Sequence, residues 1–187
     1  GEFLTWQQIR EVSQSGLVEI AAHTDASHTG ILANPQGNLE PAATSLRFDP
    51  ATGRYESQAQ FDARMRADVT AITHKIQSVT GKKPRVWVWP YGAAKGTSLA
   101  IVGEQGYQMA LTLEDGLDSS NDLMNSPRFL VASDPDGEHF ANSIVAVQTQ
   151  APLRVLHVDL DNVYDPDPAQ QARNLDQLVQ RVVDVVQ

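Results

Sequence analysis

The sequence predicts an α/β fold in which strands alternate with helices and form a mostly parallel sheet. Short apolar runs alternate along the chain with segments of helical periodicity, which is the pattern of strand–helix units. The length of 187 residues suits one domain, and a hydrophobic content of 41% can fill its core. Polar residues follow directly after several apolar runs, and parallel sheets form their sites where strands end.

Five segments have the apolar spacing of helices, and two of them begin with a capping signal. Thr5 and Gln8 form a capping box at the start of the first segment. Ser57 can cap the second and longest segment, which ends at Gly81. The predicted helices cover residues 5–15, 58–80, 97–105, 138–148 and 168–186.

Five shorter apolar runs lie between or beside these helices and are predicted to be strands. They cover residues 17–22, 85–89, 107–113, 128–131 and 154–160. Residues 29–55 have no clear period and are punctuated by glycine and proline. We interpret that stretch as a surface loop at the rim of a site, because structureless stretches of such length are usually functional or disordered.

The composition excludes several classes of function. A net charge of −9 argues against DNA or RNA as a partner, because nucleic-acid binding needs clustered cations. The chain has no cysteine, so it can form neither a disulfide nor a thiolate metal site. No apolar stretch approaches the roughly 18 residues that a membrane-spanning helix needs, so no transmembrane segment is predicted.

His23 and His28 are the candidate metal ligands. His23 directly follows the apolar run 17–22, and a strand end holds an imidazole more precisely than a loop does. Imidazole suits zinc, nickel, cobalt and iron, but a catalytic metal usually takes three protein ligands. Asp25 lies between the histidines and could approach such a metal. The alternative is that both histidines are ordinary polar loop residues.

A second motif runs from Arg85 to Gly92, through Trp87, Trp89 and Tyr91. Alternation along a strand places Arg85 and both tryptophans on one face, where a buried arginine would need an anionic partner. The Pro-Tyr-Gly turn that follows can aim backbone N–H groups at a developing oxyanion. The alternative is an ordinary core strand followed by a turn.

The two motifs together, His-Thr-x-x-x-His and Arg-x-x-x-x-Pro-Tyr-Gly, resemble the polysaccharide deacetylases of carbohydrate esterase family 4. The similarity extends over nearly the whole chain and is strongest to one branch of that family. This branch comprises bacterial periplasmic enzymes that partly de-N-acetylate poly-β-1,6-N-acetylglucosamine for biofilm export. The segments that carry the branch resemblance are residues 6–8, 17–20, 34–38, 112–116 and 158–168.

The resemblance implies a distorted (β/α) barrel built around one divalent metal ion, which would be zinc, nickel, cobalt or iron. It also implies hydrolysis of the acetamide group of N-acetylglucosamine units, with release of acetate. By position in the motifs, His23 and His28 would bind the metal. The backbone N–H of Tyr91 would bind the oxyanion.

The same resemblance suggests roles for five further residues. Arg85 would orient the catalytic carboxylate, and Asp115 is a plausible partner for it. Trp89 and Pro90 would line the groove for the sugar. His157, in a Val-Leu-His sequence, would be a candidate acid. The alternative is a structural histidine at a strand end that forms a hydrogen bond with a nearby carboxylate.

The chain departs from the family in lacking its paired aspartates, which supply the base and the third metal ligand. In the resembling branch those residues lie upstream of the region that matches this chain. We therefore expect an incomplete barrel without its N-terminal strands, and weak or no deacetylase activity from this chain alone. Residues 1–158 would form the partial deacetylase domain. Residues 159–187 would lead into a second, glycosidase-like domain.

Two hypotheses of other classes remain open at this stage. A polysaccharide-binding module without chemistry would fit the missing aspartates and the tryptophans of the second motif. A structural fragment that completes a barrel with a partner segment would fit as well, and its unpaired sheet edges would favour self-association. For the parent protein, the resemblance implies a periplasmic location with outer-membrane association.

Overall fold

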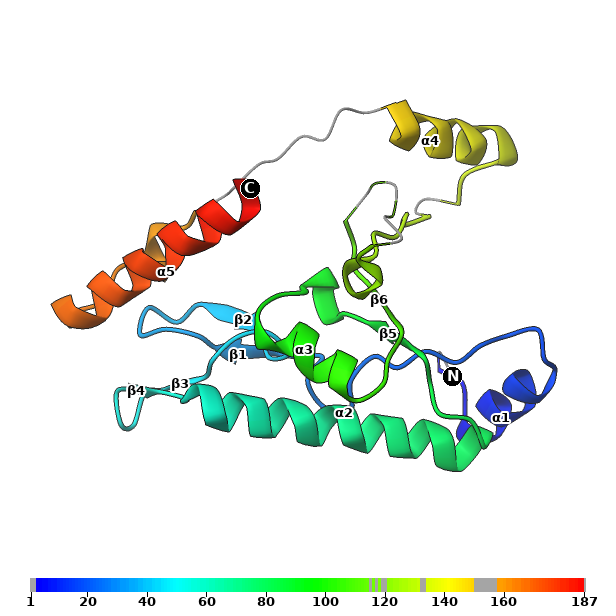
Figure 1. The fold of residues 1–187 in the computed structure, drawn as a ribbon, viewed down its shortest axis with the longest axis horizontal. Helices are drawn as coiled ribbons and strands as arrows, with labels where there is room; N and C mark the ends of the chain where they lie inside the picture. Colours follow the sequence, from blue (N-terminus) through cyan, green and yellow to red (C-terminus); the bar gives the residue numbers. More distant parts are fainter. Residues whose placement is uncertain are drawn as a thin grey trace.

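The computed structural model describes residues 3–114, 116, 118, 121–131, 134–149 and 158–186, and Figure 1 shows their arrangement. The helices are α1 (Trp6–Gln14), α2 (Gln58–Thr80), α3 (Thr97–Glu104), α4 (Gly137–Thr149) and α5 (Pro168–Val186). The strands are β1 (Gly30–Leu32), β2 (Leu39–Pro41), β3 (Phe48–Asp49), β4 (Arg54–Tyr55), β5 (Val86–Val88) and β6 (Met109–Leu111). Short 3₁₀ turns are η1 (Pro90–Gly92), η2 (Leu123–Asn125) and η3 (Leu160–Asn162). The five predicted helices are confirmed to within one residue at each end.

The centre of the fold is a short parallel arc. β5 and β6 pair in parallel, with Trp87 opposite Ala110. On the outer sides, Ala22 forms a parallel bridge with Trp87, and Ser126 forms one with Leu111. The order in space therefore follows the order in the sequence, as in a chain of β/α units. The carboxyl ends of these segments meet at one edge, where such folds place their sites.

Several of the predicted strands are corrected by the structure. The runs 85–89 and 107–113 contain β5 and β6, but in residues 17–22 only Ala22 pairs with a neighbouring strand. Earlier in that run Leu17 is 90% exposed, because no partner covers it within the described chain. Residues 128–131 form no strand. Of the run 154–160, residues 154–157 lie outside the described residues, and Leu160 begins η3.

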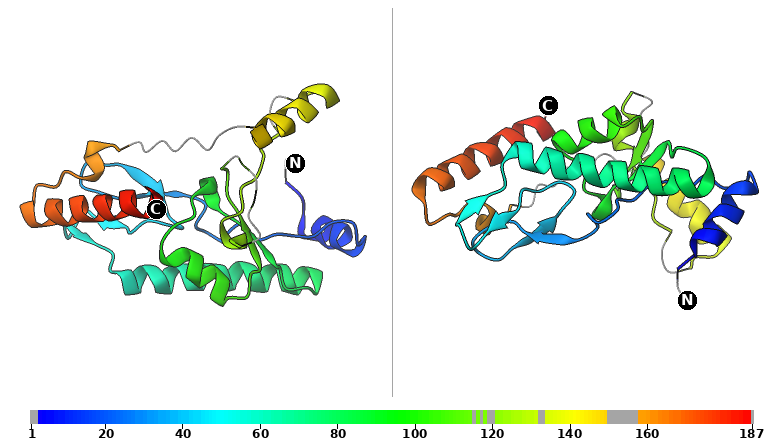
Figure 2. Two further views of the ribbon diagram at one scale, coloured as in Figure 1. Left: turned by 45° about the horizontal axis from the view of Figure 1, so that its top comes forward. Right: turned by 90° about the horizontal axis from the view of Figure 1, so that it is seen from below.

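Two tryptophans form the centre of the core. Trp87 and Trp89 are completely buried, and their rings contact each other edge to face with centroids 5.8 Å apart. The ring of Tyr107 packs on Trp87 at 5.3 Å. Figure 2 shows α2 and α3 running side by side, and residues of both complete the core. The other buried apolar members of the core are Ala22, Ala43, Phe61, Met65, Val69, Ile76, Ile101, Val102 and Ala110.

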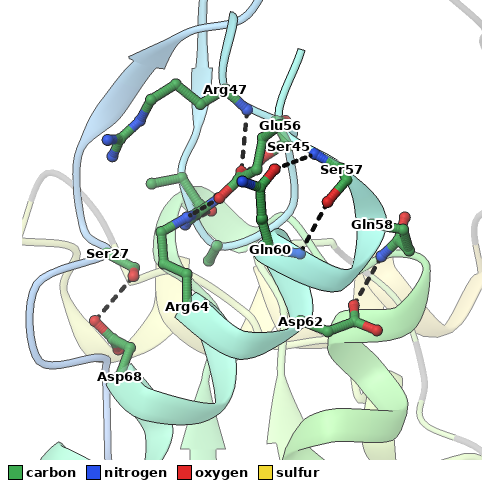
Figure 3. Close-up of polar contacts among 12 residues, drawn as sticks. Ser27, Ser45, Arg47, Glu56, Ser57, Gln58, Gln60, Asp62, Arg64 and Asp68 are labelled. Carbon is green, nitrogen blue, oxygen red and sulfur yellow. Dashed lines mark hydrogen bonds and ion pairs between the residues drawn. The ribbon is translucent and has the colours of Figure 1, made fainter.

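Helix α2 is held at both ends by local signals. Ser57 accepts a hydrogen bond from the backbone of Gln60, while the Gln60 side chain accepts one from the Ser57 N–H, so the capping box is complete (Figure 3). At the other end Gly81 adopts the left-handed conformation with φ of 75°. The helix therefore begins and ends where the sequence predicts.

The stretch 29–55, expected to lack regular structure, contains two small antiparallel hairpins, β1–β2 and β3–β4. The Arg64 side chain on α2 ties this insertion together (Figure 3). Its guanidinium donates to the Ala42 and Ser45 carbonyls and to both carboxylate oxygens of Glu56. These strands are only two or three residues long, so periodicity could not predict them.

The segment that follows residue 157 docks on the same insertion. The buried Asn34 side chain donates to the Asp161 carbonyl at 3.0 Å. Tyr55 donates its hydroxyl to the buried Asp165 carboxylate at 3.2 Å. Burial, together with the negative charge of Asp165, raises the pKa of Tyr55 to about 12. These two contacts hold the segment just before α5 against the hairpins.

Helix α4 stands apart from the sheet in Figure 1. Its apolar residue Phe140 packs on Phe129 with ring centroids 6.2 Å apart. None of the helices in the described part of the chain combines the length and apolarity needed to cross a bilayer.

The Arg64–Glu56 pair predicts a defined dependence of stability on pH. Hydrogen bonding from Arg64 outweighs burial and lowers the pKa of Glu56 below its ordinary value of 4.5. A carboxyl whose folded pKa is depressed contributes stability above the unfolded pKa, and loses it as pH falls through the folded pKa. We expect Glu56→Gln to lower the free energy of unfolding by about 1–3 kcal/mol at pH 6.

Urea unfolding of wild type and Glu56→Gln at pH 6 and pH 3 checks this expectation. The difference between the two proteins should shrink at pH 3, because the unfolded-state carboxyl is then protonated and the charged pair stabilises the folded state less. An equal difference at both pH values would show that the charge of Glu56 does not stabilise the insertion. Other titrating groups are common to both proteins and cancel in the comparison.

Candidate metal centre

His23 lies at the carboxyl end of the first segment of the arc, and β5 fixes its ring. Its Nδ1 atom is 2.8 Å from the carbonyl oxygen of Val88. A carbonyl oxygen only accepts, so Nδ1 carries the hydrogen and the neutral ring keeps its lone pair on Nε2. Ligand histidines in metal sites are commonly oriented in this way by a backbone carbonyl.

His28 is brought to His23 by the loop between them. The two ring centroids are 4.7 Å apart, with an angle of 51° between the planes. Both residues are exposed to solvent, so a metal ion can reach them. The structure therefore brings together the two histidines that the sequence singles out as candidate ligands.

Asp68 on α2 organises the loop between the two histidines, and sequence reasoning missed it. Its carboxylate accepts from the Asp25 and Ala26 N–H groups at 2.9 and 2.8 Å. It also accepts from the Ser27 hydroxyl at 2.9 Å, as Figure 3 shows. The side chain is only 8% exposed. A signal existed, because Asp68 stands three residues after the buried Met65, on the inward side of α2.

Asp25 does not approach the histidines as a ligand. Its carboxylate forms an ion pair with Lys75 of α2. The expectation that Asp25 could supply the third ligand is therefore not supported by its placement. Within the described residues, no group of three or more histidine, aspartate or glutamate side chains is positioned to hold a metal.

The turn after β5 brings Tyr91 against His28. Tyr91 adopts a left-handed conformation (φ 56°, ψ 14°), and its ring centroid lies 4.6 Å from that of His28. A Cβ atom on Gly92 would lie 2.6 Å from the Cβ of Leu113, so only glycine fits there. The Tyr91 N–H donates to no atom in the part of the chain that the structure describes, and it remains available to a ligand.

The structure places Trp89 and Pro90 in the core rather than on a groove. Both are fully buried, and the Trp89 Nε1–H points to the Met124 carbonyl at 3.5 Å. The expectation that they line a surface for sugar is corrected, because both side chains are buried and Trp89 packs in the core. They directly precede Tyr91 in the chain, so their burial anchors the start of the turn.

Arg85 lies at the amino end of β5, away from the Tyr91 turn. It forms a bidentate pair with Glu19, and 61% of its side chain is exposed. The pair raises the pKa of Arg85 above its ordinary value, through hydrogen bonding first and charge second. The expectation of a buried arginine is wrong. Asp115 and His157 lie outside the described residues.

Comparisons with known proteins identify the family of the chain. The sequence profile described as "Polysaccharide deacetylase" matches residues 3–110, which include both histidines and the Tyr91 turn. The chain belongs to the polysaccharide deacetylase family. A second profile, described as "Hypothetical glycosyl hydrolase family 13", matches residues 157–187.

Similar proteins are found among curated sequences and solved structures. Over 98% of its length the chain is 43% identical to the poly-beta-1,6-N-acetyl-D-glucosamine N-deacetylase of Escherichia coli K12, but it spans only 27% of that relative. Its fold resembles the BpsB deacetylase domain from Bordetella bronchiseptica (TM-score 0.65, 45% identity, covering 69% of this chain and 49% of that one). It also resembles a de-N-acetylase from Aggregatibacter actinomycetemcomitans (TM-score 0.68, 34% identity, covering 75% and 53%). The predicted α/β fold of the deacetylase type is thus confirmed.

The described residues fit part of a metal site in this family. Two imidazoles share one edge of the sheet, and the hydrogen bond to Val88 leaves Nε2 of His23 for a metal. Imidazole is a ligand for zinc, nickel, cobalt and iron alike, so the donor set does not choose among them. A third protein ligand is not found among the described residues.

Asp68→Asn tests the loop that holds the histidines. An asparagine amide offers one acceptor oxygen where the carboxylate offers two, so at least one buried donor loses its partner. We expect the free energy of unfolding to fall by about 1–3 kcal/mol. Amide hydrogen exchange at Ala26 should quicken, and urea unfolding with exchange measurements checks both effects.

Asp62→Asn is the matched control on the same helix. Among the described residues, Asp62 accepts from the Gln58 and Thr97 side chains alone, and both donors can bond to water instead. The role of Asp68 in holding the loop would be contradicted if Asp68→Asn lowered the free energy of unfolding no more than Asp62→Asn does and left amide exchange at Ala26 unchanged.

Proposed function

We propose that this chain is part of a metal-dependent de-N-acetylase that acts on N-acetylglucosamine units of a β-1,6-linked polysaccharide and releases acetate. The observation that carries the proposal is the His23–His28 pair beside the Tyr91 turn, whose backbone N–H has no acceptor among the described residues. Membership of the deacetylase family supports the reaction type. The name of the Escherichia coli relative, a poly-beta-1,6-N-acetyl-D-glucosamine N-deacetylase, supports the substrate.

His23 and His28 would hold one divalent metal, either zinc, nickel, cobalt or iron. When bound, such a metal supplies Lewis-acid chemistry at the acetamide and assists the attacking water. The Val88 carbonyl keeps His23 in the tautomer that this role needs. The Asp68 carboxylate keeps the intervening loop, and with it His28, in place.

The Tyr91 N–H would donate to the amide oxygen of the substrate as negative charge develops on it. A preorganised backbone donor stabilises that charge without reorganisation during the reaction. The left-handed turn and the close packing of Gly92 on Leu113 fix the direction of this N–H. The oxyanion role predicted for Tyr91 therefore continues as part of this proposal.

The general base and the third metal ligand would come from outside the described residues. No carboxylate among the described residues joins the histidine pair. Asp115 and His157 stay candidates, while Arg85 is engaged with Glu19 at the opposite end of β5. We accordingly propose that this barrel is incomplete and that the chain alone turns over acetylated oligomers slowly or not at all.

The C-terminal part would belong to a second module. The glycosyl hydrolase profile matches residues 157–187, close to the predicted boundary after residue 158. We propose that residues 159–187 lead into a glycosidase-like domain of the parent protein. A periplasmic location with outer-membrane association remains our proposal from the resemblance.

Metal titration tests the histidine pair directly. We expect one site for Ni²⁺ or Zn²⁺ by calorimetry at pH 7.5, with binding abolished in His23→Ala and in His28→Ala. His74→Ala is the control, because His74 is an exposed histidine on α2 outside the pair. Equal binding by wild type and all three variants would refute the metal site and favour a polysaccharide-binding module without chemistry.

A further inference from the structure

The two candidate ligands are held by different means. His23 donates to the Val88 carbonyl, whereas no hydrogen bond or ion pair to the His28 ring is found among the described residues. The His28 ring instead lies against two other rings. His23 is 4.7 Å away on one side, and Tyr91 is 4.6 Å away with planes tilted by 32°. Centroid separations of about 4.5–7 Å are those of attractive aromatic pairs.

The Tyr91 ring is presented from a backbone that cannot move far. The Trp89 N–H donates to the Leu111 carbonyl at 2.9 Å, immediately before the turn. Gly92 packs on Leu113 so closely that a Cβ atom has no room. Tyr91 is therefore fixed from both sides, and so is the direction in which its ring leaves the turn.

Tyrosine is a costly residue at this position. A non-glycine residue in the left-handed region is strained by roughly 1 kcal/mol or more, and glycine or asparagine would fit better. The ring gives little burial in return, because Tyr91 is 52% exposed. The packing contact found for the ring is the one with His28. Strain at such a residue points to a role in the site rather than in the core.

We propose that the Tyr91 side chain is a positioning residue that holds the His28 imidazole in its metal-binding orientation. This role is separate from that of the Tyr91 backbone N–H, and it deepens the proposed function, on which the identity of His28 as a ligand rests. The three rings form a row of tilted contacts, held at one end by the Val88 hydrogen bond and at the other by the strained turn.

Two substitutions in the full chain separate the ring from the backbone. Tyr91→Asn tolerates the left-handed conformation and keeps the N–H but removes the ring, and Tyr91→Gly is a second ring-free variant. Tyr91→Phe keeps the ring and removes only the hydroxyl. NMR relaxation of the imidazole C–H groups reports the order of each histidine ring, with His23 as the internal reference. Calorimetric titration with Ni²⁺ reports affinity.

We expect the His28 ring to become mobile in Tyr91→Asn and Tyr91→Gly, while the His23 ring stays ordered. Tyr91→Phe should behave as wild type. Ni²⁺ binding should weaken roughly three- to ten-fold in the ring-free variants, the range set by one aromatic pair. Urea unfolding should show that the ring-free variants are at least as stable as wild type.

An ordered His28 ring in both ring-free variants would overturn the proposal, as would equal loss of order in Tyr91→Phe. Unchanged Ni²⁺ affinity in the ring-free variants would also overturn it. If wild type itself binds no Ni²⁺ at the pair, the proposed function fails, and the relaxation measurement still decides whether Tyr91 orders His28.

Discussion

Val88 makes two hydrogen bonds to the segment that carries the first histidine. Its N–H donates to the Ala22 carbonyl at 2.8 Å, and its carbonyl accepts from Nδ1 of His23 at the same distance. The first bond extends the parallel arc by one strand position, and the second sets the tautomer and direction of a candidate metal ligand. Strand pairing and ligand orientation thus depend on the same residue, and a rotation of the His23 ring would break its hydrogen bond to the Val88 carbonyl.

The rest of the site is arranged around that pairing. On one side of the loop, the buried Asp68 carboxylate satisfies two backbone donors and one hydroxyl, so the chain returns to place His28 beside His23. On the other side, the left-handed turn places the Tyr91 ring against the His28 ring. Each holding group comes from a different element, namely α2, β5 and η1. A site assembled in this way depends on the whole α/β arrangement rather than on one loop.

The sequence could predict the parts of this arrangement that rest on local signals. The helices follow from periodicity and caps, and the histidines and the Pro-Tyr-Gly turn follow from their places after apolar runs. Contacts between distant residues could not be predicted. Alternation predicts Trp87 and Trp89 on one face, but it cannot show that this face is buried in the core. The groove role of Trp89 comes from the family resemblance alone. The partners of Arg85 and Asp68 lie 66 and about 40 residues away in sequence.

The most direct test of the account is the tautomer of His23. The measurement is a long-range ¹⁵N–¹H correlation of the imidazole rings in the metal-free protein, at a pH where the rings are neutral. A neutral ring carries one N–H, and the correlation identifies the nitrogen that carries it. We expect His23 to carry its hydrogen on Nδ1, and we expect Nε2 to be the nitrogen perturbed when Zn²⁺ is added. An Nε2–H tautomer, or an average of both, would contradict the account, because Val88 would then not orient the ring as a ligand.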